Sequence, residues 1–297
     1  QQRVALQSNG VTTIFSSLTP LVDAYNAAVT GDTIYLSGGA FAMPNTISKG
    51  IAIFGAGFHQ DSTTATQATV ITNNWTIGLN ADNLYVEGVQ MQAVSKSSSI
   101  VVDNVSFVRC RINTVAFTYT APGSSTNYAF IQNIIGYLEI NGVINSLITN
   151  NIFEGRIEQC HNNVIANNYL IGDATSSFYI IRNSNTNLVK NNVFNDAEPY
   201  AVNGTGNDVQ YNVFKNATPN LGVVPLDFNN YKGIDLTTVY VNQSGNAFDY
   251  SQDYHLQPAA QTTYLGDDGS QVGIYGGMFP FKAGTLPENP HFQLKTI

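Results

Sequence analysis

Ser146-Leu-Ile-Thr-Asn-Asn-Ile-Phe153 is followed by three windows with the same pattern: Asn163-Val-Ile-Ala-Asn-Asn-Tyr-Leu170, Asn187-Leu-Val-Lys-Asn-Asn-Val-Phe194 and Asn207-Asp-Val-Gln-Tyr-Asn-Val-Phe214. Each window has a polar start, an apolar pair, one or two Asn and then an aromatic or aliphatic residue. Looser copies start at Asn83, Asn104 and Asn127, so the windows recur in steps of 17 to 24 residues. A period near 20 residues with variable length is typical of a solenoid.

The windows predict strands, because apolar residues alternate over a short length between Asn, Gly or Ser. None has the longer 3.6-residue periodicity of a helical repeat, which excludes helical solenoids. Equal offsets in stacked coils would lie above one another at about 4.8 Å. Two sets of residues share an offset: Asn151, Asn168, Asn192 and Asn212, and Ser146, Asn163, Asn187 and Asn207. An amide is both donor and acceptor, so such a column can hydrogen-bond along the axis. Asn confined to loops would not keep register with Ile, Val and Phe.

A solenoid has no size limit set by a single core, so we expect one continuous domain over residues 1–297. We expect a strand, a capping helix and the first coils in 1–57, repeat coils in 58–238, and C-terminal coils with a capping tail in 239–297. Only 11% of the 297 residues are charged, which suits stacked coils because like charges one above another repel. The net charge of −8 and the lack of a basic stripe argue against nucleic acid and anionic membranes as partners. No apolar run is long enough to span a membrane.

The start of the chain and its two cysteines bear on location. Gln1-Gln2 with no signal-peptide core fits a mature secreted chain after cleavage, and equally a chain shortened at its start. Cys110 and Cys160 are too few for a disulfide framework. We expect both to be unpaired and buried.

The two ends of the chain carry a resemblance. Pro20–Val29 is a predicted short helix with Thr19 as its cap, and Gly31-Asp-Thr-Ile34 and Ile51-Ala-Ile-Phe-Gly-Ala-Gly57 follow it. This opening resembles that of right-handed parallel β-helix proteins of the pectate-lyase-like superfamily, in which an N-terminal helix covers the open end of the coil. Tyr254-His-Leu256 and Val272-Gly-Ile-Tyr-Gly-Gly277 are similar to the ending of secreted and cell-surface β-helix proteins of Bacteroidota.

The resemblance implies an all-β right-handed parallel β-helix with a short N-terminal capping helix, secreted or at the cell surface. It does not select a function, because this fold hosts lyases, hydrolases, adhesins and inert scaffolds. Polygalacturonase-like hydrolases are disfavoured, since none of the four His lies between two Gly and no Asp pair lies in the repeats.

One candidate site is a Ca²⁺-dependent uronan lyase centre on a third wall, late in each coil. Such a reaction needs carboxylates that hold Ca²⁺ and a basic residue beside them. On that wall the pattern places Glu139, Glu158 and Asp227 as metal ligands, with Arg156 and Arg182 as catalytic residues. The simpler interpretation is ordinary surface charge. Asp267-Asp268-Gly269 is a second possible Ca²⁺ loop, although a plain turn is the simpler interpretation there too.

The other candidate is binding without catalysis. Tyr137, Tyr179 and Tyr200 fall on or near the third wall and would offer ring faces to a sugar. We therefore expect a binding or structural role, with a polysaccharide as the favoured ligand. A uronan lyase, and a subunit held by another cell-surface protein, stay open as alternatives. No cofactor is certain, and Ca²⁺ enters only with the lyase.

Overall fold

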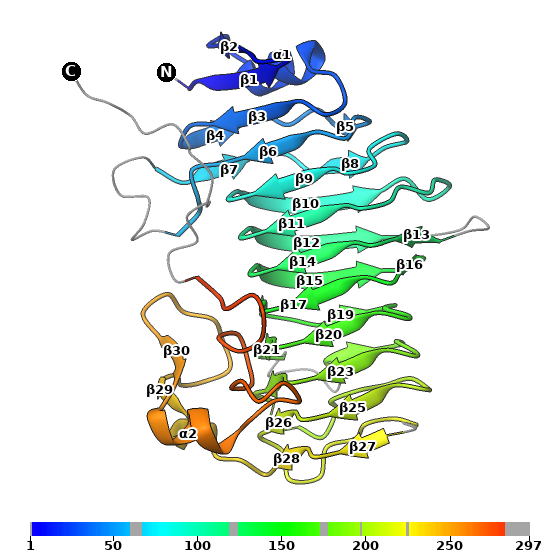
Figure 1. The fold of residues 1–297 in the computed structure, drawn as a ribbon, viewed down its shortest axis with the longest axis vertical. Helices are drawn as coiled ribbons and strands as arrows, with labels where there is room; N and C mark the ends of the chain where they lie inside the picture. Colours follow the sequence, from blue (N-terminus) through cyan, green and yellow to red (C-terminus); the bar gives the residue numbers. More distant parts are fainter. Residues whose placement is uncertain are drawn as a thin grey trace. The chain divides into compact units, whose positions relative to one another are not determined.

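The computed structural model describes residues 2–59, 67–118, 124–172, 178–196, 198–223 and 226–282. The fold is mostly β, a parallel β-solenoid of about 9 turns with a short N-terminal helix, as predicted (Figure 1). The right-handed sense in which the chain coils around the solenoid axis stays a prediction. The chain divides into two compact units, Gln1–Ala129 with Lys282–Ile297 and Phe130–Phe281, which are described in turn.

The first unit has two sheets whose strands are parallel from β3 onward. Its first sheet runs in the order β2 (Val11–Phe15), β1 (Val4–Ser8), β3 (Thr33–Leu36), β6 (Ala52–Phe54), β9 (Tyr85–Glu87), β11 (Ser106–Val108). Its second sheet contains β4 (Gly39–Phe41), β7 (Thr69–Ile71), β10 (Gln90–Lys96) and β12 (Arg111–Phe117), with β8 (Trp75–Ile77) beside β10 and β5 (Thr46–Ile47) beside β8. β13 (Ser125–Thr126) also belongs to this unit. β1 pairs antiparallel with both β2 and β3.

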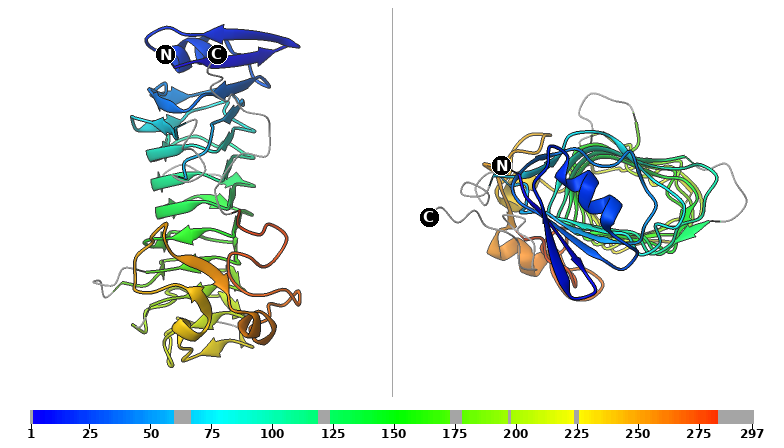
Figure 2. Two further views of the ribbon diagram at one scale, coloured as in Figure 1. Left: turned by 90° about the vertical axis from the view of Figure 1, so that its left-hand side faces the viewer. Right: turned by 90° about the horizontal axis from the view of Figure 1, so that it is seen from above.

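Helix α1 (Pro20–Ala27) covers the open end of the first coil (Figure 2), and it buries Leu21, Ala24 and Tyr25. It ends two residues before the predicted Val29. The predicted cap is wrong in detail, since the Thr19 side chain makes no capping hydrogen bond. At the other end Lys49 Nζ lies 2.7 Å from the carbonyl oxygens of both Tyr25 and Ala28, which satisfies carbonyls that a helix terminus leaves unpaired.

The second unit has three walls of parallel strands. Its first sheet contains β14 (Ala129–Ile131), β17 (Leu147–Thr149), β20 (Val164–Ala166), β23 (Leu188–Lys190), β25 (Asp208–Gln210) and β27 (Leu226–Phe228). The second wall contains the first half of β15 (Ile134–Ile140), then β18 (Ile152–Phe153), β21 (Tyr169–Leu170), β24 (Val193–Phe194), β26 (Val213–Phe214) and β28 (Tyr231–Lys232). The second half of β15 pairs with β19 (Ile157–Glu158), which pairs with β22 (Ile181–Arg182). β16 (Val143–Ile144) completes the unit.

Two apolar columns and two polar ladders fill the interior of this unit. The apolar columns are Ile148, Ile165, Val189 and Val209, and Phe153, Leu170, Phe194 and Phe214, all at most 2% exposed. The predicted ladder is confirmed: Asn192 Oδ1 accepts hydrogen bonds from the backbone N–H (2.9 Å) and the side-chain amide (3.0 Å) of Asn168. The same pattern extends the ladder to Asn133 at one end and Asn230 at the other.

The second predicted ladder is also confirmed. Ser146, Asn163, Asn187 and Asn207 are at most 3% exposed, and each of the first three donates its backbone N–H to the side-chain oxygen of the next. Cys110 and Cys160 are unpaired and fully buried, as expected.

The chain leaves the solenoid after β28. η1 (Leu236–Thr238) leads into an antiparallel hairpin of β29 (Tyr240–Asn242) and β30 (Asp253–Leu256), followed by α2 (Pro258–Thr263). No further coil forms in the described part of 239–297, although coils were expected there. The next residues, 264–281, are called the return segment. They run back along the second unit, and Gln132 in its first coil donates to the carbonyl oxygens of Phe279 and Pro280.

The tail from Met278 was expected to cover the last coil. Its described part instead reaches the first coil of the second unit, and residues 283–297 lie outside the described residues.

Candidate functional site

The third wall of the second unit carries the candidate site. Alternation along β15, β19 and β22 turns Leu138, Ile157 and Ile181 into the core, where each is fully buried. The residues that follow them therefore face outward in register, Glu139 beside Glu158 and Glu158 beside Arg182. The sequence predicted that Glu139, Glu158 and Arg182 face outward on one wall, and in the structure they are neighbours on that wall.

Polar contacts tie this cluster into one network. Tyr137 Oη lies 3.1 Å from Glu139 Oε2 and 3.1 Å from Glu158 Oε2. Arg156 Nε donates to Glu158 Oε2 at 3.0 Å, and Arg182 Nη1 lies 3.6 Å from Glu158 Oε1. Two arginines and two glutamates balance, so the cluster has no net formal charge.

Aromatic side chains complete the surface. The guanidinium carbon of Arg156 lies 5.2 Å from the ring centroid of Tyr137 and 5.3 Å from that of Phe178. Arg182 lies 5.0 Å from the Phe178 ring. Tyr179 and Tyr200 form an edge-to-face pair with centroids 5.3 Å apart. We call this surface the aromatic–arginine patch, and it consists of Tyr137, Arg156, Phe178, Tyr179, Arg182 and Tyr200.

A shallow pocket of about 340 Å³ opens within the patch. Its lining is Gly136, Tyr137, Gly155, Arg156, Phe178, Tyr179 and Ile180. The two glycines belong to neighbouring coils, and a Cβ on Gly155 would lie 2.3 Å from the carbonyl oxygen of Gly136, so only glycine fits there. The pocket thus has aromatic rings and a guanidinium group in its lining.

Phe178 is the functional candidate that sequence reasoning did not single out. Its side chain is 48% exposed, although Phe is usually buried. A signal in the sequence could have found it: Phe178 precedes Tyr179 at the start of a third-wall stretch, and on a strand of alternating residues one of two adjacent aromatic side chains must face outward. Asn220, which donates to Tyr179 Oη at 2.7 Å, was also missed.

The phenol of Tyr137 stays protonated at neutral pH. Burial raises its pKa first, and the nearby carboxylates of Glu139 and Glu158 raise it further. Tyr137 is therefore a hydrogen-bond donor to the carboxylates and unsuited to act as a general base.

Asp227 does not belong to this wall, and its predicted placement is wrong. It lies on β27 in the first sheet, where its register partner is Val209. The coil that starts at Asn207 is short, so Leu226–Phe228 begins the next coil instead of ending this one. Asp227 pairs with Lys232 at 2.8 Å.

The remaining carboxylates are a poor set of Ca²⁺ ligands. Ca²⁺ takes 6–8 oxygen ligands, yet Glu158 Oε1 faces Arg182 and Asn183 while Oε2 faces Arg156 and Tyr137. Across the described residues, no group of three or more His, Cys, Asp or Glu side chains is arranged to hold a metal ion.

The segment Asp267-Asp268-Gly269 forms a turn with its acidic groups already engaged. Asp267 accepts from Lys190 at 2.6 Å and from Asn191 at 2.8 Å, and Asp268 accepts from Ser270. Lys190 therefore anchors the return segment.

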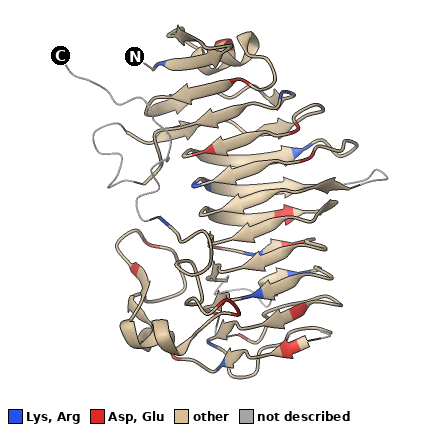
Figure 3. Ribbon diagram, viewed as in Figure 1, with Lys and Arg blue, Asp and Glu red and all other residues tan. Residues whose placement is uncertain are grey.

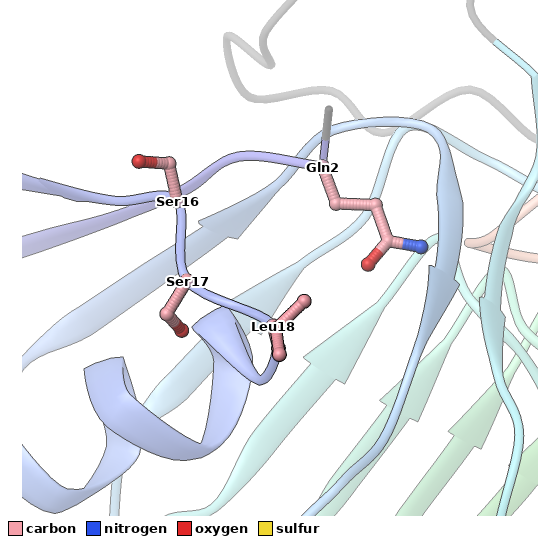
Figure 4. A pocket seen from close by; sticks show the side chains of 4 residues that line it. All are labelled: Gln2, Ser16, Ser17 and Leu18. Atoms are coloured by element: carbon pink, nitrogen blue, oxygen red, sulfur yellow. The ribbon is translucent and has the colours of Figure 1, made fainter.

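A second hollow in the first unit is less suited to binding. It is lined by Gln2, Ser16, Ser17 and Leu18 (Figure 4) and has no ionisable or aromatic side chain. Leu18 projects from its edge with 99% of its surface exposed. The ribbon in Figure 3 shows how few of the described residues are charged.

Comparison of the chain with protein-family models, curated proteins and solved structures finds no match, so the site rests on its own geometry. Neither of the described α-helices is long and apolar enough to cross a membrane.

Proposed function

We propose that the protein binds a neutral polysaccharide through the aromatic–arginine patch, outside the cell or at its surface. The observation that carries this proposal is the exposed Phe178 ring between two arginines, which lines a pocket next to the charge-balanced cluster of Glu139, Glu158, Arg156 and Arg182. The resemblance of the chain's two ends to secreted β-helix proteins supports the extracellular location.

Sugars are recognised by apolar ring faces combined with a few well-placed hydrogen-bond donors. Phe178, Tyr137 and Tyr179 supply the aromatic surface. Arg156 bonds to Glu158 through Nε, and among the described residues its two terminal amino groups are left to donate to hydroxyl oxygens. Because these residues come from successive coils, the patch follows the solenoid axis and suits a chain of several sugar units.

Charge balance favours a neutral chain over a uronan. A uronate would need an uncompensated cation, and Glu158 already accepts from Arg156 and faces Arg182. The net charge of −8 adds repulsion of a polyanion.

The test is affinity electrophoresis of the intact chain through gels containing a neutral glucan, a xylan, alginate or pectate, followed by calorimetry with the retained polymer. We expect retardation by a neutral polymer and at least about a tenfold loss of affinity in Phe178→Ala, equivalent to about 1.4 kcal/mol. Phe228→Ala is the matched control, because Phe228 is similarly exposed (46%) but lies on the first sheet. Free migration in every neutral gel would contradict the proposal.

The uronan lyase is the second candidate, now without Asp227 as a ligand. The same polymers test it. A lyase acting on alginate or pectate with added Ca²⁺ would release unsaturated uronates, which are followed by their ultraviolet absorbance. A positive trace that disappears in Arg182→Ala, with the fold intact, would favour catalysis over binding. The alternative of a subunit held by another surface protein would be favoured if no polymer binds.

A further inference from the structure

Among the described residues, the last coil of the second unit leaves the edges of two sheets without a strand partner. β27 and β28 end their strand orders, and no described strand pairs with their outer sides. Every earlier ladder residue from Asn133 to Asn212 donates its backbone N–H to the amide oxygen of the next Asn. Asn230 accepts from Asn212, but its own N–H has no acceptor among the described residues. The edge is therefore a template that another polypeptide could pair with.

Apolar side chains flank this edge. Leu226 and Phe228 are 37% and 46% exposed on the outward side of β27. An exposed edge strand with apolar side chains is prone to self-association.

Asp227 and Lys232 occupy the two positions where the core would continue. Asp227 follows Ile148, Ile165, Val189 and Val209 in one buried column, and Lys232 follows Phe153, Leu170, Phe194 and Phe214 in the other. The two charged side chains meet at 2.8 Å, and Asn230 Nδ2 donates to Asp227 Oδ1 at 2.8 Å. The ion pair thus closes the apolar core at its end.

A further coil stacked on this end would bury both charges against apolar columns. Removing water from a carboxylate and an ammonium costs more than their mutual attraction returns unless their remaining hydrogen bonds are made. At present the side chains of Lys232 and Asp227 are 33% and 41% exposed, so both stay hydrated.

We propose that the Asp227–Lys232 ion pair is an end stop, which keeps the free edges of β27 and β28 from pairing with the same edges of a second copy of this chain. A two-fold axis through both walls would place β27 against β27 and β28 against β28 in one contact, so a second copy fits both edges at once. In that contact the charged pair of each copy would face that of the other. This inference is independent of polysaccharide binding.

The experiment replaces the pair by the residues of the preceding coil, Asp227→Val with Lys232→Phe. Light scattering after size exclusion across a dilution series is expected to give a monomer for the natural chain. The apolar variant is expected to dimerise, with at least a tenfold lower dissociation constant. Asp227→Asn with Lys232→Gln keeps the size and polarity of the pair and is expected to remain monomeric.

A third variant separates edge pairing from misfolding. It adds Leu226→Lys and Phe228→Lys to the apolar pair, which places repelling charges on the outward face of β27. Return to a soluble monomer supports the proposal even if the apolar pair alone precipitates. Persistent association of this variant overturns it. So does a folded apolar variant that stays monomeric, or a natural chain that already dimerises through β27.

Discussion

At the scale of single residues, the Asn ladder explains why Asn recurs at core positions that would otherwise be apolar. Asn192 is fully buried, and its side-chain amide donates to the carbonyl oxygen of Ile165 at 2.8 Å and to Asn212 Oδ1 at 3.0 Å. Its oxygen accepts from Asn168. Each side-chain amide therefore pairs with a backbone carbonyl oxygen near the bend and also hydrogen-bonds to the Asn of the neighbouring coil.

Asn192→Leu is expected to destabilise the protein by about 1–3 kcal/mol, because Asn168 and Asn212 would each lose a buried partner. Urea unfolding monitored by circular dichroism measures the difference. Asn26→Leu on the exposed side of α1 is the control and should leave the midpoint nearly unchanged. An unaltered midpoint for Asn192→Leu would show that the ladder contributes nothing to stability.

The two cysteine thiols are expected to be unreactive in the folded protein. Burial raises the pKa of both Cys110 and Cys160 to about 12, so neither is a thiolate at neutral pH. A colorimetric thiol reagent at pH 8 should label neither in the native chain and both in denaturant. Thr12→Cys, on exposed β2, supplies a reactive control. Prompt labelling of the native chain without this substitution would mean that the surrounding coil opens.

At the scale of elements, the return segment depends on amides at one corner of the second unit. Asn150 Nδ2 donates to the carbonyl oxygens of Ile274 (2.9 Å) and Gly276 (2.8 Å). A Cβ on Gly276 would lie 1.6 Å from the carbonyl oxygen of Gln271 and 2.8 Å from Asn167 Nδ2, so only glycine permits this approach. The Val272–Gly277 motif therefore holds the return segment against the side-chain amides of Asn150 and Asn167.

The anchor at Asp267 should make the return segment sensitive to acid. Partial burial raises the pKa of Asp267, but hydrogen bonds from Lys190 and Asn191 outweigh it and lower the pKa overall. A carboxyl group whose pKa is lowered in the folded state stabilises it above the unfolded pKa, about 3.9, and loses that contribution as pH falls through the lowered value.

Amide exchange in residues 264–277, corrected for intrinsic rates, should therefore accelerate several-fold below about pH 4. Asp267→Asn should show faster exchange already at neutral pH and less acid dependence. Asp208→Asn, on β25, is the matched control and should behave like the natural chain. Equal acid dependence in Asp267→Asn and the natural chain would assign the effect to another carboxyl group.

At the scale of the whole molecule, the low charge density sets how binding should respond to salt. Only 11% of residues are charged and the net charge is −8, while the formal charges around the patch cancel. Binding of a neutral polysaccharide should then change by less than about twofold when ionic strength rises from about 0.05 to about 0.5 M, because few charges are left to screen. Affinity electrophoresis with added salt measures this. A steep decrease in affinity would instead identify an anionic ligand.

The repeat itself was readable from sequence because it is a local pattern. Strand, bend and ladder residues recur at equal offsets, and stacking turns equal offsets into contacts, as for Asn168 and Asn192. Even so, the looser windows were placed one residue early. Asn83, Asn104 and Asn127 have positive φ and form an exposed amide ladder of their own, while Leu84, Val105 and Tyr128 take the buried position.

Sequence alone determined the parallel solenoid, the buried Asn ladders, the N-terminal capping helix and the outward cluster of Glu139, Glu158, Arg156 and Arg182. Only the tertiary structure decided that Phe178 completes that cluster, that Asp227 ends a core column, and that the return segment lies along the corner amides. The physical reason is that turns of variable length change which wall a residue reaches. Contacts between residues 76 to 148 positions apart leave no periodic signal in the chain.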